Sequence, residues 1–185
     1  MSFFRLTIAD DEVQKRTESY KNLMSMLYGF IIAFSVTAMS GFWYSLFPRS
    51  VNWNASQTVL VLHLAGGIMA LFLFVVYFFL HQKDQQQRWW WLFVPWRLKQ
   101  DKEEPLQHFR QRQLGHLLTW IMLVVFTSGL LIALPGLLFY SGYVWMQGYY
   151  TTQILRGVHF WASVLLVPVL ITHMLWIARD RRVAT

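Results

Sequence analysis

The apolar residues of this chain gather into four long runs that are separated by polar segments. The runs cover roughly residues 23–46, 59–80, 115–138 and 154–178. Each is about as long as the roughly 20 helical residues needed to cross the hydrocarbon core of a bilayer. The pattern predicts an all-α integral membrane protein, a four-helix bundle that forms one domain over residues 1–185.

Composition supports this class and removes several kinds of chemistry. The chain is 56% hydrophobic and only 14% charged, which is far from the composition of a soluble domain. It contains no Cys, so disulfides, iron–sulfur clusters and thiolate ligation by this chain are excluded. The segment before the first run is too polar and too acidic for a cleavable signal peptide, and we expect the first helix to be retained.

The basic residues predict the orientation of the helices. Of the 16 Lys and Arg residues, seven lie in the loop 81–114, four precede the first run and three follow the last. Only Arg49 and Arg156 lie in the other two loops or next to them. Because positive charge marks the cytoplasmic side, both termini and the long loop are predicted to be cytoplasmic (N-in/C-in), in a bacterial inner membrane.

Aromatic residues cluster near the ends of the predicted spans. Trp residues at 89–91 and 96 are typical of anchors at the membrane interface, and a quinone or partner surface is the alternative. The outer loop FYSGYVWMQGYYTT, residues 139–152, is either a docking surface for an outer partner or a second interfacial anchor. The sequence favours neither interpretation of this loop.

Histidines are the candidate functional residues, because strongly polar side chains at membrane depth are costly. His159 and His173 are fourteen residues apart in the fourth span. In a helix this places them about 21 Å apart in height and within roughly 40° of each other around the axis. One helix face therefore presents two imidazoles at two depths.

Each of these two histidines has a possible partner at its own height. His63 is near the outer end of the second span, level with His159, and His116 is near the inner end of the third span, level with His173. Two depth-matched pairs predict two b-type haems inside the bundle, each with one axial imidazole on either side. For any one histidine, a hydrogen bond between helices is the simpler alternative.

Small residues fit the same interpretation, since a porphyrin needs room beside a helix. Gly66 and Gly67 follow His63 on its own helical face, and Gly129 lies about 20 Å above His116, at the level of the outer haem. A weak internal repeat also aligns the Ser-Gly pair at 40–41 with that at 128–129. The matched positions in the two halves are Tyr28 with His116, His63 with His159, and Tyr77 with His173.

The two remaining histidines are placed differently. His81 lies on the face of His63 but near the inner end of its span, as a propionate contact, a quinone contact or an ordinary interfacial residue. It is also the substitute ligand if His116 does not bind the inner haem. Lys83 and Asp84 are further candidates for a quinone pocket, and His108 lies in the polar loop, where we expect it to be solvated.

The sequence Arg156-Gly-Val-His159, followed by His173 and combined with His63 on the second span, resembles the di-haem cytochrome b membrane subunits of respiratory hydrogenases, formate dehydrogenases and thiosulfate reductases. The resemblance implies an electron-transfer subunit that works with a partner carrying other redox centres and with the membrane quinone pool. It implies that His63 and His159 hold the outer haem, that His173 holds one side of the inner haem, and that Arg156 belongs to the haem-binding motif.

The chain departs from this family at one ligand. The family takes the second inner ligand from the first span, where this chain has Tyr28, so His116 must replace it. The fourth span also resembles the cytochrome b of quinol:cytochrome c complexes, although Tyr77 stands where that family has a second histidine. Two further classes fit the four spans and their histidines: a membrane anchor with one or no haem, and a metal or proton transporter.

Overall fold

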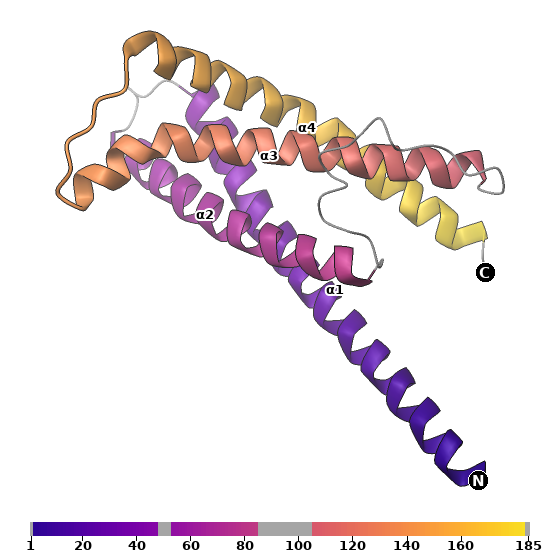
Figure 1. Cartoon of the computed structure of the whole chain (residues 1–185). Helices are drawn as coiled ribbons and strands as arrows, with labels where there is room; N and C mark the ends of the chain where they lie inside the picture. Colours follow the sequence, from indigo (N-terminus) through magenta and orange to yellow (C-terminus); the bar gives the residue numbers. More distant parts are fainter. Residues whose placement is uncertain (1, 48–52, 85–104, 184–185) are drawn as a thin grey trace. The chain divides into compact units, whose positions relative to one another are not determined.

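The computed structural model describes residues 2–47, 53–84 and 105–183, and these form four helices (Figure 1). No strand occurs within these residues. The helices are α1 (Ser2–Leu46), α2 (Trp53–Asp84), α3 (Leu106–Tyr140) and α4 (Tyr149–Val183).

Each helix contains a segment that is long and apolar enough to cross a membrane. This confirms the four predicted spans, all of which lie within longer helices. The helices continue beyond the apolar runs into polar residues, where the backbone hydrogen bonding of the helix is maintained. The membrane-spanning segments are Lys21–Leu46, Trp53–Lys83, Phe109–Tyr140 and Tyr149–Trp176.

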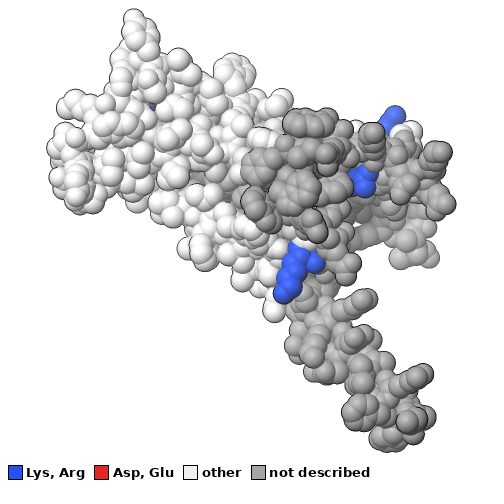
Figure 2. All heavy atoms as spheres, viewed as in Figure 1, with Lys and Arg blue, Asp and Glu red and all other residues white. Residues whose placement is uncertain are grey.

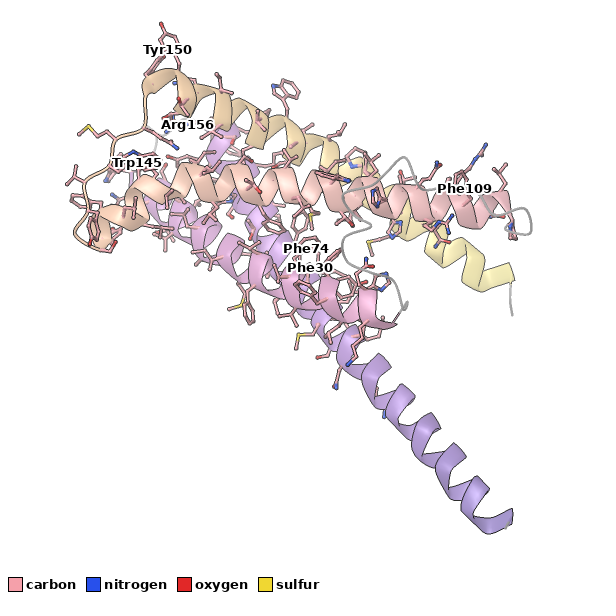
Figure 3. The ribbon with its side chains drawn as sticks, in the orientation of Figure 1. Phe30, Phe74, Phe109, Trp145, Tyr150 and Arg156 are labelled. Carbon is pink, nitrogen blue, oxygen red and sulfur yellow. The ribbon has the colours of Figure 1, made fainter. Side chains whose placement is uncertain are left out.

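The chain divides into two compact units, Met1–Arg88 and Trp89–Thr185. In the first unit, α1 and α2 form an antiparallel hairpin with an aromatic contact at its centre. The rings of Phe30 and Phe74 point toward each other with centroids 5.9 Å apart (Figure 3). Both side chains are buried, as is Ala70, so this hairpin has a small core of its own.

In the second unit, α3 and α4 form another antiparallel hairpin. Its buried apolar residues include Val125 on α3 and Leu166 on α4. At the end of α3, Gly142 has φ of +88°, a left-handed conformation that favours glycine and ends the helix. The next residue, Tyr143, donates its backbone N–H to the Leu138 carbonyl at 2.9 Å, which satisfies an otherwise open helix end.

Many apolar side chains of the spans are exposed, including Ile32, Met39, Phe72 and Leu175, and few are fully buried. The described surface in Figure 2 is almost entirely uncharged. Exposed apolar area of this extent is typical of helices solvated by lipid, and the chain is a multi-pass membrane protein by this criterion.

Candidate functional site

The imidazole of His63 on α2 lies directly against the backbone of α1. Its Nδ1 atom is 2.8 Å from the carbonyl oxygen of Thr37. A Cβ on Gly41 would come within 2.6 Å of the ring's Cε1 and 2.9 Å of its Nδ1, so only glycine leaves room for this ring. We call the Thr37 carbonyl and Gly41 the first seat.

The imidazole of His159 on α4 lies against α3 in the same way. Its Nδ1 is 3.0 Å from the carbonyl oxygen of Val125, and the Ser128 hydroxyl lies 3.2 Å from the same nitrogen. A Cβ on Gly129 would approach the ring's Cε1 to 2.9 Å. We call the Val125 carbonyl and Gly129 the second seat.

Both seats favour one tautomer of the ring. A carbonyl oxygen can only accept a hydrogen bond, so Nδ1 of His63 and of His159 carries the proton and donates it. In a neutral imidazole the lone pair then resides on Nε2. This is the nitrogen through which such a histidine ligates a metal, with the hydrogen bond at Nδ1 fixing the ring.

A buried serine precedes the glycine of each seat. Ser40 donates to the Val36 carbonyl at 2.7 Å, and Ser128 donates to the Val124 carbonyl at 2.6 Å. They are the two polar residues found buried among the described side chains. Their hydroxyls are satisfied by their own helices, which lets a polar group lie at a helix contact without a desolvation penalty.

A third imidazole, that of His173, also lies against a glycine of α3. A Cβ on Gly115 would lie 3.3 Å from the ring's Cε1. The contact is looser than in the first two seats, and we call Gly115 the third seat. Because His173 reaches the α3 backbone here, a porphyrin between these two helices would require them to separate at this level.

His116 follows Gly115 on α3. Its Nε2 is buried and makes no hydrogen bond to any described residue. A buried imidazole nitrogen without a hydrogen bond is costly, and Nδ1 of His173 is also buried without a hydrogen bond to a described residue. The predicted pair of His116 and His173 is therefore brought to one level of one hairpin, with the His173 ring packed on the α3 backbone.

The two glycines that follow His63 have different surroundings. A Cβ on Gly66 would lie 2.6 Å from Thr37 Oγ1, and one on Gly67 would lie 3.7 Å from Thr37 Cγ2. Both glycines thus face Thr37 of the neighbouring helix. Gly66 permits the close packing of α1 and α2 that brings the Thr37 carbonyl to His63.

At the other end of α2, the rings of His81 and Tyr77 stack with centroids 5.6 Å apart and an interplanar angle of 9°. Lys83 is exposed two residues beyond His81. The side chains of Asp84 and His108, and the Trp residues at 89–91 and 96, lie outside the described residues. His81 and Lys83 are the described residues of the predicted quinone region.

Arg156 is exposed on α4, one turn before His159 (Figure 3). The loop at this end of the hairpin carries Trp145, and Tyr150, in the first turn of α4, is 81% exposed. Gln147 ties the loop down by donating to the Leu131 carbonyl at 3.1 Å. The aromatic side chains are therefore displayed outward from an anchored loop.

The sequence interpretation missed the residues that form the seats. Thr37 and Val125 contribute backbone carbonyls, which leave no signature in side-chain types. Gly41 was detectable, since it belongs to the Ser-Gly pair that aligns with residues 128–129 in the internal repeat. Gly115 could also have been found, because it lies fourteen residues from Gly129, the same interval that separates His159 from His173.

Comparison with known proteins adds no further identification: no family model matches the chain, and no curated protein or solved structure is similar to it. Among the described residues, no group of three His, Cys, Asp or Glu side chains is placed to hold a metal ion.

Proposed function

We propose that this protein is a membrane-bound b-type cytochrome, a di-haem subunit that transfers electrons between a redox partner at the outer face and the membrane quinone pool. The observation that carries the proposal is the pair of seated histidines. His63 and His159 each belong to an apolar hairpin, and each has Nδ1 occupied by a backbone carbonyl. A bis-histidine haem needs two such imidazoles, one on either side, each ligating the iron through Nε2.

The donor set of the chain fits this group. With no Cys available, ligands must come from His, Met or oxygen atoms, and imidazole is the ligand that b-type haem iron takes from both sides in electron-transfer proteins. A haem requires only one protein ligand on each face, which agrees with histidines that occur singly along the helices. When bound, it supplies one-electron redox chemistry.

The residues of the chain have distinct roles in this proposal. His63 and His159 hold the outer haem, with Gly129 beside it and Arg156 as the cation for its propionates. His173 holds the inner haem. Its second ligand is His116, whose buried Nε2 lacks a hydrogen-bond partner among the described residues, and His81 is the competing ligand. His81, which stacks on Tyr77, and Lys83 are the described candidates for the quinone contact.

A membrane anchor with a single haem is the second candidate, and one observation favours it. The third seat occurs only in the second hairpin. At the corresponding positions of the first hairpin the chain has Leu27 in place of glycine and Tyr77 in place of histidine. Only the level of His63 and His159 therefore has a histidine seat in both hairpins.

The number of haems separates these candidates. Purified chain is assayed by the pyridine haemochrome method, and the haem content is divided by the protein content from amino-acid analysis. Two haems b per chain support the proposal, one supports the anchor, and none rules out both. The alternative of a cytochrome b of the quinol:cytochrome c type is tested by adding quinol to the purified chain. This alternative requires quinol to reduce the haem without any other protein partner.

A further inference from the structure

The first and second seats are built from the same positions of the two hairpins. Thr37, Ser40 and Gly41 have the same spacing as Val125, Ser128 and Gly129. The serines use their hydroxyls alike, because Ser40 and Ser128 each bond the carbonyls three and four residues earlier. The internal repeat expected from the sequence thus extends to side-chain geometry.

The contact between ring and glycine is also the same. In each seat Cε1 is the ring atom nearest to the Cβ position of the glycine, and Nδ1 is the next nearest. In each seat Nδ1 bonds the carbonyl four residues before that glycine. Agreement of both the contact and the hydrogen bond in two hairpins with different sequences indicates a common requirement on the ring.

We propose that the two seats are positioning elements for the haem ligands: Gly41 and Gly129 admit the rings, and the Thr37 and Val125 carbonyls fix each ring with Nδ1–H toward the neighbouring helix and Nε2 toward the iron. This inference rests on the proposed function. Gly115, fourteen residues along both α3 and α4 from the second seat, makes a looser contact of this kind with the His173 ring, whose Nδ1 makes no hydrogen bond to a carbonyl of the described residues.

An alanine in a seat acts first on the ring. The three atoms nearest to a Cβ at Gly41 and at Gly129 all belong to an imidazole, which can rotate, and none of the three is a backbone atom. Alanine also suits a helix better than glycine does. The variants are therefore expected to fold, with the ring pushed away from its carbonyl and Nε2 turned from its proper direction.

The experiment compares Gly41→Ala and Gly129→Ala with a matched glycine on each helix. On α1 the control is Gly29→Ala, whose Cβ would make an ordinary 3.7 Å contact with Leu73. On α3 the control is Gly136→Ala, whose Cβ would meet nothing within 4 Å. Each full-length variant is purified in detergent, and its haem content, haem midpoint potentials and low-temperature EPR spectrum are measured.

The two seat variants are expected to lose one haem at limiting haem supply, with affinity lowered by about 10-fold to 100-fold, as for other groups that orient a metal ligand. Any haem they retain shows a shifted highest g-value, because this value reports the relative orientation of two axial imidazoles. The control variants keep the wild-type haem content and EPR spectrum. Gly115→Ala changes the other haem, and by less, because its contact is looser.

Wild-type behaviour of both Gly41→Ala and Gly129→Ala in haem content, potential and EPR would overturn the positioning role and leave the proposed function intact. If the wild-type chain contains no haem, the proposed function fails first. The seats are then tested by ¹⁵N NMR of the ring nitrogens of the same full chain. Protonated Nδ1 and unprotonated Nε2 at His63 and His159 support the seats, and the opposite tautomer rejects them.

Discussion

The imidazole of His159 lies so close to Gly129 that a Cβ on the glycine would approach its Cε1 to 2.9 Å. Glycine within a helix costs about 0.5–1 kcal/mol relative to alanine. The cost is offset here by a contact between helices and by the hydrogen bond from the ring to the Val125 carbonyl. The packing of this hairpin and the orientation of its candidate ligand thus depend on the same atoms.

His63→Ala and His159→Ala are each expected to remove the same haem. Each deletes one axial ligand of that haem, so haem content should fall from about two to about one per chain in either variant. The check is a pyridine haemochrome assay combined with a redox titration that identifies the missing component. Thr172→Ala is a matched control on α4, since its hydroxyl bonds the Pro168 carbonyl of its own helix at 2.7 Å. Loss of different haems in the two histidine variants would contradict the pairing.

The inner haem is tested with three single variants, His173→Ala, His116→Ala and His81→Ala. His173→Ala should abolish the inner haem, and His116→Ala should abolish the same one if the buried Nε2 of His116 is its second ligand. The visible spectrum at low temperature distinguishes the two haems. If His116→Ala retains both haems and His81→Ala loses one, His81 is the ligand.

Ser128→Ala is expected to change the outer haem without removing it. The hydroxyl lies 3.2 Å from Nδ1 of His159, so its loss removes one polar contact from the ring. A neutral hydrogen bond of this kind contributes about 0.5–1.5 kcal/mol. We expect a small shift in midpoint potential and in the EPR spectrum.

Ser163→Ala is the control for this serine. Its hydroxyl donates to the backbone carbonyl of His159 at 2.7 Å. This hydrogen bond involves the backbone of His159 and not its ring. Equal shifts in the two serine variants would show that the effect does not depend on the contact between Ser128 and the His159 ring.

Gly66→Ala should destabilise the first hairpin, because its Cβ would lie 2.6 Å from Thr37 Oγ1. Overpacking of this kind costs about 1–3 kcal/mol. Gly67→Ala is the neighbouring control, with only a 3.7 Å contact to Thr37 Cγ2. Thermal unfolding followed by circular dichroism in detergent compares the two. Adding Thr37→Ala to Gly66→Ala should restore stability, and failure of this rescue would assign the effect to another contact.

The predicted orientation can be tested without first removing any native cysteine, because the chain has none. Ser141→Cys, in the exposed turn after α3, should react with a membrane-impermeant maleimide in intact spheroplasts. Lys83→Cys, exposed at the end of α2, should react only after the membrane is permeabilised. The reverse labelling pattern would show that the orientation of the helices is opposite to the predicted one.

The four helices could be predicted from the sequence because twenty or more consecutive apolar residues have few ways to be accommodated other than crossing a bilayer. The ends of the helices could not be predicted. Trp53–Asp84 extends past the predicted run at 59–80 on both sides, because polar side chains at the interface neither favour nor break a helix strongly enough to mark its end.

The candidate site was predictable only in part. His63 and His159 could be selected as equivalent by depth alone, since helical rise converts residue number into height. The direction of each ring could not be predicted, because it depends on the backbone carbonyls of Thr37 and Val125. Every residue has such a carbonyl, so the sequence does not indicate which one the ring will bond. Gly66 was expected to make room for a haem, whereas the structure places it against Thr37, a packing contact that the sequence does not encode locally.

The Thr37 carbonyl that orients His63 belongs to α1, which pairs with α2 in the first hairpin, and the Val125 carbonyl that orients His159 belongs to α3, which pairs with α4 in the second. The translocation machinery that inserts such a chain can therefore complete each ligand environment as soon as two helices have entered the bilayer. Biogenesis then separates into two stages. In the proposed cytochrome, insertion of a helical pair would orient its imidazole, and the haem would then be added to a polypeptide whose proposed ligands are already oriented.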